Sequence, residues 1–149
     1  MKNALLSPVA QQAVLSSCSD ASDGLETGGV LVGRYVDGVP LVTDACGPPP
    51  DSIRRRNNFI RGTIGLDAWL ASLWPNAHYL GEWHLHPQGA ATASQDDVAA
   101  MALIARNPDY HCVNPLLLVV GEHSLSRRRY FRWYVWNVGM KEIYCEVAT

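Results

Sequence analysis

Two short segments, GEWHLHP at residues 81–87 and SQDD at residues 94–97, decide how the whole chain is interpreted. The first belongs to an apolar run that predicts a short buried strand ending at the proline. Successive side chains of a strand point to opposite faces, so His84 and His86 share one face about 7 Å apart along the backbone. Two imidazoles at that separation can converge on one zinc ion.

The second segment predicts the start of a helix over residues 94–109. Ser94 and Asp97 have the spacing of a helix cap, which puts Asp97 in the first helical turn. The small residues of the loop at 88–93 allow this helix start to fold back over the end of the strand. Asp97 then becomes the candidate third zinc ligand, and a fourth position is left for water, as in catalytic zinc sites.

Each segment also has a purely structural interpretation. Two histidines on a strand are often polar groups whose hydrogen bonds are satisfied within the fold. Ser94 and Asp97 would cap a helix without any chemistry. Capping and metal binding are compatible, and the joint spacing of the two segments favours the zinc site.

The remaining chain predicts interspersed helices and strands in one mixed α/β domain over residues 1–149. A Ser-Pro start predicts a helix at 7–22, and Asp37-Gly38 between two apolar runs predicts a β-hairpin. Three prolines indicate a loop at residues 47–58. The other expected elements are a helix at 64–77 and three strands in CVNPLLLVVGEH, RRYFRWYVWNV and KEIYCEV.

Composition and charge are those of an ordinary globular chain. Its 149 residues are 48% hydrophobic and 17% charged, with a net charge of −2 at pH 7. That charge provides no field to attract nucleic acid or an anionic membrane, and the longest apolar run, residues 115–121, is too short to span a bilayer. The N-terminal segment has no sustained apolar stretch, so we expect no signal peptide and a cytoplasmic location. The four scattered cysteines form no CxxC pair and are expected to be reduced, mostly buried thiols.

Arginines and aromatic residues alternate along residues 127–137, a pattern that also occurs in surfaces binding single-stranded nucleic acid. Strand alternation explains it more simply, because Phe131 and Trp133 take one face while Tyr130 and Tyr134 take the other. We therefore expect no nucleic-acid partner.

The pattern H-x-H-P, six residues, then S-x-x-D resembles the JAMM motif of the JAB1/MPN/Mov34 metalloproteases. The residues in register are His84, His86, Pro87, Ser94 and Asp97. The family also has a glutamate just before a Gly-Gly hydrophobic run, and ETGGVLVG at residues 26–33 is similar to that segment. The resemblance implies a single MPN/JAB domain, with a curved mixed β-sheet flanked by helices in a cytidine-deaminase-like three-layer arrangement.

The same resemblance implies a role for each side chain. His84, His86 and Asp97 would bind Zn²⁺, and zinc-bound water, with its pKa lowered to about 7, would be the nucleophile. Glu26 would accept the proton of that water and return it to the leaving amine. Ser94 would donate a hydrogen bond to the scissile carbonyl and stabilise the oxyanion.

Two positions depart from the family pattern. Glu82 shares a strand face with the two histidines, where relatives have an apolar or aromatic residue, so it rivals Glu26 as the carboxylate near the metal. We expect Glu26 to be the base and Glu82 to support the ligands or contact the substrate. The loop at 88–93 lacks the prolines of many relatives, which predicts a less firmly held Ser94.

Members of the family cleave the bond after the tail of ubiquitin or ubiquitin-like proteins, process sulfur-carrier proteins, or act as metal-free binding scaffolds. Residues 59–87 resemble the small bacterial JAB peptidases that accompany ubiquitin-like conjugation enzymes in antiphage operons. This implies a ubiquitin-like protein or a conjugated bacterial enzyme as substrate, with E1/E2-like enzymes as partners. The alternatives are a non-catalytic scaffold, which usually lacks ligands that this chain has, and a peptidase for a sulfur-carrier protein.

The loop at residues 47–58 would flank the groove that a flexible substrate tail needs beside the zinc. Its three arginines, Arg54, Arg55 and Arg56, would then meet an acidic surface of the partner. The alternative is an exposed charged loop without a partner.

Overall fold

The computed structural model describes residues 3–148, so residues 1, 2 and 149 of the predicted domain lie outside the described part. The strands of the large sheet are β1 (Asn3–Leu6), β2 (Thr27–Val36), β3 (Val39–Ala45), β6 (His78–His86), β7 (Leu116–Glu122), β8 (Arg129–Trp136) and β9 (Met140–Val147). A separate small sheet consists of β4 (Ile53–Arg54) and β5 (Phe59–Ile60). The helices are α1 (Pro8–Asp20), α2 (Leu66–Leu73), α3 (Gln95–Arg106) and the short 3-10 helix η1 (Pro108–Tyr110).

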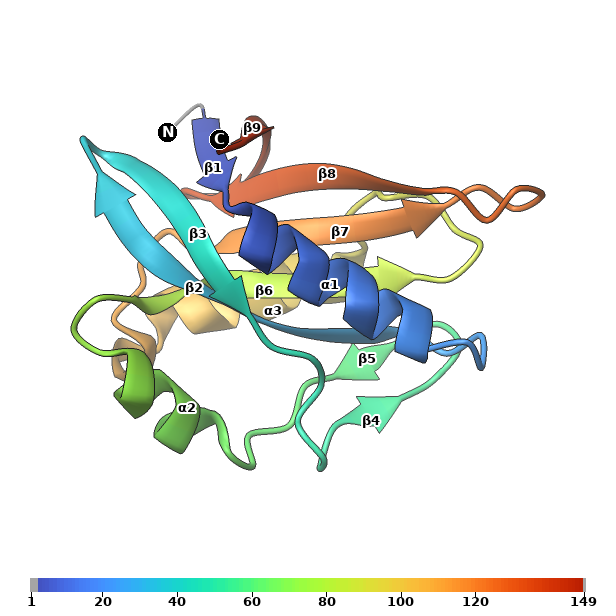
Figure 1. Cartoon of the computed structure of the whole chain (residues 1–149), viewed down its shortest axis with the longest axis horizontal. Helices are drawn as coiled ribbons and strands as arrows, with labels where there is room; N and C mark the ends of the chain where they lie inside the picture. Colours follow the sequence, from blue (N-terminus) through green and yellow to red (C-terminus); the bar gives the residue numbers. More distant parts are fainter. Residues whose placement is uncertain (1–2, 149) are drawn as a thin grey trace.

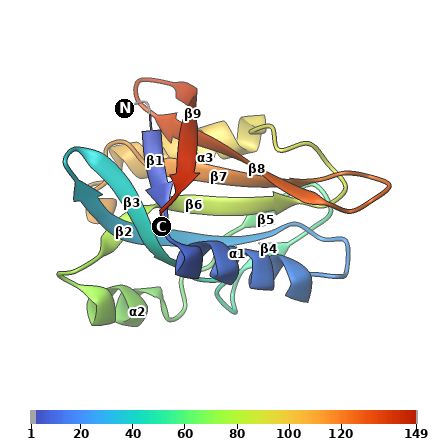
Figure 2. The same cartoon turned by 45° about the horizontal axis from the view of Figure 1, so that its top comes forward.

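The large sheet closes on itself, with the strand order β1-β3-β2-β6-β7-β8-β9. The first strand closes it, because β1 pairs in parallel with β3 on one side and with β9 on the other. Figure 2 shows β1 and β9 lying side by side. A mixed α/β domain is therefore present as predicted, but the expected cytidine-deaminase-like three-layer arrangement is wrong. An open layered sheet has two free edges, and here β1, which the sequence analysis did not predict, pairs with both edge strands.

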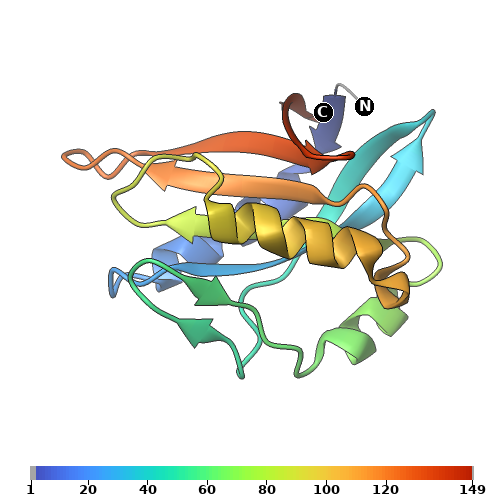
Figure 3. The same cartoon turned by 180° about the vertical axis from the view of Figure 1, so that it is seen from behind.

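The two faces of the sheet carry two separate hydrophobic clusters. One cluster lies between the sheet and α1 and includes Val14, Trp83 and Leu118. The other lies under α2 and α3 and includes Met101 and Leu117. Figures 1 and 3 show α1 on one side of β6 and β7 and α3 on the other side. The parallel neighbours β6 and β7 are therefore covered on both faces, which explains their nearly continuous apolar sequences.

The predicted helices and strands are all present, but the helix expected at 64–77 ends at Leu73, the helix expected at 94–109 ends at Arg106, and the loop expected at 47–58 contains a strand. Asp37 and Gly38 have φ angles of 50° and 79°, as the two central residues of a type I′ hairpin turn require. Helix α1 begins after the capping residue Ser7, and β6 ends directly before Pro87. The predicted loop contains the short strand β4, which pairs with β5. None of the helices within residues 3–148 is long and apolar enough to cross a membrane.

Candidate metal centre

The pairing of β2 with β6 brings the glycine-rich segment close to the first histidine. Gly28 pairs with His84, so Glu26, which directly precedes β2, lies beside the end of β6. A Cβ atom on Gly28 would lie 2.3 Å from the carbonyl oxygen of Trp83 and 2.8 Å from Cδ2 of His84. Only glycine at position 28 allows β2 to pass this close to the histidine strand, while a Cβ atom on Gly29 would lie 1.9 Å from the Cys46 carbonyl oxygen.

His84, His86 and Asp97 come together at the end of β6. Nδ1 of His84 lies 2.7 Å from Oδ1 of Asp97, and Nε2 of His86 lies 3.3 Å from Oδ2. The side chains are mostly buried, with exposed fractions of 8%, 14% and 6%. The spacing thus placed both histidines correctly on one face of β6, and the start of α3 brings Asp97 onto that face. Their role as metal ligands stays a prediction.

Asp97 also caps helix α3. The Ser94 Oγ atom accepts the N–H of Asp97 at 3.1 Å, while Oδ2 of Asp97 accepts the N–H of Ser94 at 2.9 Å. This reciprocal pair is a capping box. Asp97 therefore caps the helix, as the purely structural interpretation of SQDD requires, and it also contacts the two histidines. Ser94 is exposed, and its hydroxyl accepts the capping bond, so the O–H hydrogen can donate elsewhere.

The loop between β6 and α3 is held by two tyrosines of β8. The Tyr130 hydroxyl accepts the N–H of Ala91 at 3.1 Å. The Tyr134 hydroxyl donates to the Ala91 carbonyl at 3.0 Å and accepts the N–H of Ala93 at 3.3 Å. The missing prolines therefore do not leave this loop unsupported, because side chains from a distant strand constrain it instead. These tyrosines were not found by the sequence analysis as part of the site.

His86 presents Nε2 to the centre. Its Nδ1 lies 3.1 Å from the Ala90 carbonyl oxygen, and only a protonated Nδ1 can donate to a carbonyl. Burial lowers the pKa of the His86 imidazole, but the hydrogen bond that it donates to Asp97, the negative charge of Asp97, the Ala90 carbonyl and Glu26 together outweigh burial, so the net shift is upward. A backbone carbonyl that orients one ring nitrogen in this way commonly prepares the other nitrogen for a metal.

The charges around Asp97 and Glu26 shift their pKa values in opposite directions. Burial raises the pKa of Asp97, but hydrogen bonds from His84 and His86 outweigh this effect and hold the pKa well below its usual value. Burial of the half-buried Glu26 raises its pKa, the nearby His86 opposes that rise, and the Asp97 carboxylate adds to it. A carboxylate with a raised pKa is better suited to take up and release a proton near neutral pH.

The donor set of the centre fits zinc in kind. Two imidazoles and one carboxylate are common ligands of catalytic zinc, and donors of a tetrahedral zinc ion stand about 3.3 Å apart. His86 and Asp97 have this separation, whereas His84 and Asp97, at 2.7 Å, share a direct hydrogen bond. As they stand, no three His, Cys, Asp or Glu side chains within residues 3–148 are arranged around a metal position. Zinc binding therefore requires the His84–Asp97 contact to open by roughly 0.6 Å.

Comparison with known proteins places this domain in a family. The family described as prokaryotic homologs of the JAB domain matches residues 8–135. The chain belongs to this family. The solution structure of protein DSY2949 from Desulfitobacterium hafniense has the same fold, with a TM-score of 0.67 and 16% sequence identity over 97% of this chain and 92% of that one.

Two similar proteins carry the name CD-NTase/cGAS isopeptidase. The one from Enterobacter hormaechei subsp. hoffmannii (strain UCI 50) is 38% identical over 111 residues, which cover 72% of this chain and 61% of that protein. The one from Escherichia coli (strain TW11681) is 27% identical over 106 residues, which cover 67% of this chain and 64% of that protein. The JAB-family chain thus spans less than two thirds of the length of either relative.

Glu82 of this JAB-family chain is engaged in a buried ion pair. It accepts hydrogen bonds from Nε of Arg61 at 2.6 Å and from the Tyr79 hydroxyl. Burial lowers the pKa of Arg61, but the Glu82 carboxylate more than offsets this, so the pKa lies above its usual value. The Glu82 carboxylate is therefore bonded to Arg61 and Tyr79 and not to a metal ligand, so the expected support of the ligands is wrong. The expected contact with the substrate stays a prediction. No spacing in the sequence pointed to Arg61, and the one signal was that a glutamate within a buried strand needs a counter-charge.

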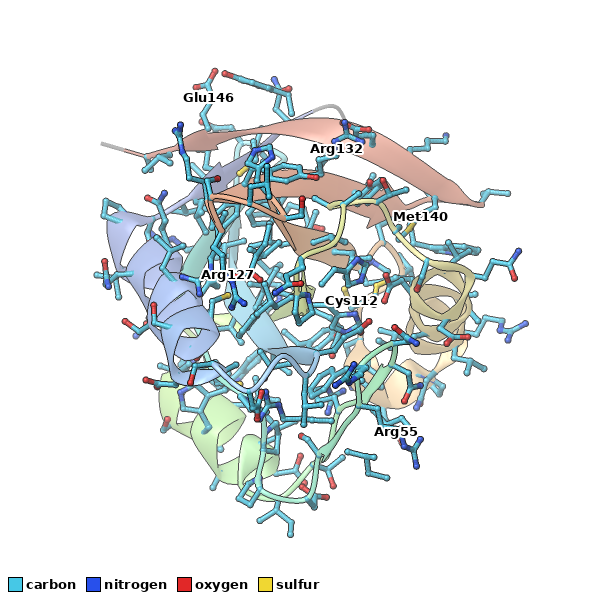
Figure 4. The ribbon with its side chains drawn as sticks, turned by 90° about the vertical axis from the view of Figure 1, so that its right-hand side faces the viewer. Arg55, Cys112, Arg127, Arg132, Met140 and Glu146 are labelled. Carbon is cyan, nitrogen blue, oxygen red and sulfur yellow. The ribbon has the colours of Figure 1, made fainter. Side chains whose placement is uncertain are left out.

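The three loop arginines do not behave alike. Arg54 forms an ion pair with Asp23 at 2.8 Å, and its Nε donates to the Glu26 carbonyl at 3.0 Å. Arg55 and Arg56 are exposed, and Figure 4 shows Arg55 pointing away from the body of the protein. An acidic partner surface stays a prediction for Arg55 and Arg56, while Arg54 is bound within the chain.

The cysteines lie outside the centre. All four are free, and burial raises the pKa of Cys18 and Cys145 to about 12 and that of Cys112 to about 11. Thiols with such pKa values carry little thiolate near neutral pH and are poor nucleophiles. The expectation of mostly buried thiols holds fully for Cys18, whereas Cys46, Cys112 and Cys145 are only partly buried.

A cavity of about 760 Å³ lies near the start of β6, lined by Leu66, Leu70, Trp74 and His78 among others. Arg61 and Tyr79, the two partners of Glu82, also line this cavity. The lining residues do not include Glu26, His84, His86 or Asp97, so the cavity adjoins the Glu82–Arg61 pair rather than the candidate metal centre itself.

Proposed function

We propose that this chain is a zinc-dependent isopeptidase that hydrolyses the bond after the C-terminal tail of a ubiquitin-like protein or of a conjugated bacterial enzyme. The observation that carries the proposal is the convergence of two imidazoles and the Asp97 carboxylate next to Glu26. Membership of the JAB family supports it, and so does the isopeptidase name of the two relatives.

His84, His86 and Asp97 would hold the metal, and the direct contacts between them would give way to contacts through the ion. The Ala90 carbonyl keeps the His86 ring oriented, and the capping box keeps the Asp97 carboxylate at the helix start. Zinc, when bound, supplies the polarisation that allows a water molecule to ionise near neutral pH. Two of the three ligands are thus oriented by bonds that do not depend on the metal.

Glu26 and Ser94 would handle the proton and the developing charge. In this proposal Glu26 takes the proton of the attacking water and passes it to the leaving amine, for which its raised pKa is favourable. The Ser94 hydroxyl donates to the scissile carbonyl oxygen as negative charge grows there. Ser94 also caps the N-terminus of α3, whose dipole favours negative charge nearby.

The substrate class comes from the family resemblance and from the name of the relatives. We extend that name to this chain and propose that its substrate is a CD-NTase/cGAS-type enzyme whose C-terminal carboxyl is joined to an amine. The bond between that carboxyl and the amine is the one that is cut. The conjugating E1/E2-like enzymes of a bacterial cytoplasm would be the functional partners.

Zinc content and cleavage, measured on the same preparations, test the proposal. Wild type, Asp97→Ala and Glu26→Gln would be loaded with zinc, dialysed and analysed for metal per chain. The cleavage probe is a CD-NTase tail peptide whose C-terminal carboxyl is joined to a lysine Nε atom of a dye-labelled peptide. We expect near-stoichiometric zinc in wild type and Glu26→Gln, a sharp loss of zinc in Asp97→Ala, and strongly reduced cleavage in both variants.

Asp96→Ala is the matched control, because Asp96 is the exposed neighbour of Asp97 in the same helical turn. It should keep both zinc and cleavage. A wild type that stays free of zinc after loading would overturn the metal centre and favour a non-catalytic scaffold. A zinc-loaded wild type that leaves the probe intact would overturn this substrate and favour the sulfur-carrier alternative or a scaffold.

A further inference from the structure

The short β4–β5 hairpin is bonded directly to the main chain of Glu26. The N–H of Glu26 donates to the Arg55 carbonyl at 2.8 Å, and the N–H of Arg55 donates to the Asn58 carbonyl at 3.0 Å. Glu26 lies just before β2 begins, so its backbone is outside the regular pairing of the large sheet. The hairpin therefore supplies the hydrogen bonds that the sheet does not give to this residue.

The side chain of Arg54 also attaches the hairpin to the segment before β2. Its Nε donates to the Glu26 carbonyl at 3.0 Å, and its Nη2 lies 3.4 Å from the Leu25 carbonyl. The other side of the guanidinium forms two bonds to the Asp23 carboxylate, at 3.0 and 2.8 Å. One planar guanidinium thus joins Asp23, Leu25 and Glu26 of the segment before β2, and it can do this because its donors have fixed directions.

The same hairpin also contacts a candidate metal ligand. The Phe59 ring meets the His84 ring edge to face, with centroids 5.5 Å apart. Just beyond β5, Arg61 is anchored to Glu82 on the histidine strand. The hairpin is therefore fixed to β6 at one end and to the Glu26 segment at the other, so it spans the two sides of the candidate centre.

We propose that Arg54 is a positioning residue that fixes the main chain at Glu26, so that the Glu26 carboxyl faces the two histidines. Arg54 acts through Glu26 and touches neither the metal ligands nor the substrate. The role of Glu26 as the base rests on the proposed function, whereas its immobilisation by Arg54 does not. Loss of the fork leaves the Glu26 carbonyl with one bond fewer and frees the segment to move away from the centre.

Amide hydrogen exchange at Glu26 tests the immobilisation without any activity. The variants are Arg54→Ala, the conservative Arg54→Lys, and Arg56→Ala as matched control, because Arg56 is an exposed arginine of the same hairpin. We expect the Glu26 amide to exchange roughly 10-fold faster in Arg54→Ala, because its bond to Arg55 opens more often. Arg54→Lys should restore little, since an ammonium has no fork. Equal exchange in Arg54→Ala and Arg56→Ala would overturn the proposal.

Kinetics with the tail probe test whether Arg54 acts through Glu26. Arg54→Ala should lower kcat roughly 10-fold with KM and the thermal midpoint unchanged, because only the placement of the base is lost. In a Glu26→Gln background the same substitution should have no further effect on the residual rate. A KM effect alone, or an equal loss in both backgrounds, would overturn the proposal. If wild type does not cleave the probe, the proposed substrate fails, and the exchange experiment still decides the role of Arg54.

Discussion

The carboxylates of Glu82 and Asp97 are both buried on the same face of β6, but they have different partners. Glu82 belongs to the strand and accepts bonds from Arg61 and Tyr79. Asp97 reaches the same face from α3 and contacts two imidazoles. Exposed fractions are 3% for Glu82 and 4% for Asp97. Neither burial nor hydrogen bonding therefore distinguishes the two.

The chemistry of the partner distinguishes them. A guanidinium stays protonated throughout the useful pH range, so Glu82 has a permanent counter-charge. A neutral imidazole presents a lone pair, and imidazoles lose their proton close to neutral pH. Asp97 and its imidazoles can thus exchange shared protons for a divalent cation, whereas the Glu82–Arg61 pair cannot. The partners of Asp97 can therefore bind a divalent cation together with it, whereas Arg61, the charged partner of Glu82, cannot.

The largest expected effect is on the cleavage rate, where substitution of Glu26 and substitution of Glu82 should differ. Glu26→Gln should lower the cleavage rate by roughly 100- to 10,000-fold with zinc content unchanged, because an amide cannot accept the proton. Glu82→Gln should keep zinc and most of kcat, since the Glu82 carboxylate is already paired with Arg61. Steady-state kinetics on the tail probe would measure both. A folded Glu82→Gln protein as inactive as Glu26→Gln would assign the base to Glu82 instead.

The next effect concerns stability at the buried ion pair. Arg61→Ala should lower the free energy of unfolding by about 3–5 kcal/mol, because it leaves Glu82 buried without a counter-charge. Urea unfolding measures this loss. The double substitution Arg61→Met with Glu82→Gln should recover much of it, since no unpaired charge remains. An unchanged midpoint for Arg61→Ala would show that water or another group replaces the guanidinium.

Zinc should stabilise the protein through Asp97 but not through Glu82. At a zinc concentration 100 times the Kd, linkage raises the free energy of unfolding by about 2.7 kcal/mol. Unfolding curves with zinc and with a chelator would measure this difference, which should vanish in Asp97→Ala and persist in Asp96→Ala. A zinc effect that survives Asp97→Ala would place the metal elsewhere.

The smallest effect belongs to an exposed carboxylate. Asp51 accepts the N–H of Ile64 and of Thr63, each at 3.0 Å, and these bonds hold its pKa below the usual value. A lowered folded-state pKa means that the stabilisation is present above the unfolded pKa and is lost as pH falls through the folded one. Asp51→Asn should therefore lower the thermal midpoint slightly at pH 7 and not at pH 2. If wild type and Asp51→Asn had equal thermal midpoints at pH 7 as well as at pH 2, these bonds would contribute nothing to stability.

Much of the candidate centre follows from short spacings in the sequence. The period of two in a strand placed His84 and His86 on one face, and the cap spacing placed Asp97 three residues after Ser94. The same alternation put Trp133 with the cluster under α1 and Tyr134 with the cluster under α3. These features are local, because backbone geometry relates residues a few positions apart whatever the rest of the chain does.

Contacts between distant residues were not predictable in this way. Arg61 is 21 residues from Glu82, Arg54 is 28 residues from Glu26, and Tyr130 is 39 residues from Ala91. No spacing rule joins such pairs, since their meeting depends on strand register and on how the hairpin folds back.

By itself the sequence determined which side chains share a strand face or a helix start: the two histidines, the capping aspartate and the glycines that need close approach. The tertiary structure decided that β1 closes the sheet, that Glu82 is neutralised by Arg61, and that Arg54 holds the Glu26 segment. The physical reason is how far apart in the chain the interacting residues lie. Periodicity and capping act within one turn or strand, whereas edge pairing and buried charge compensation are settled only when the whole chain has packed.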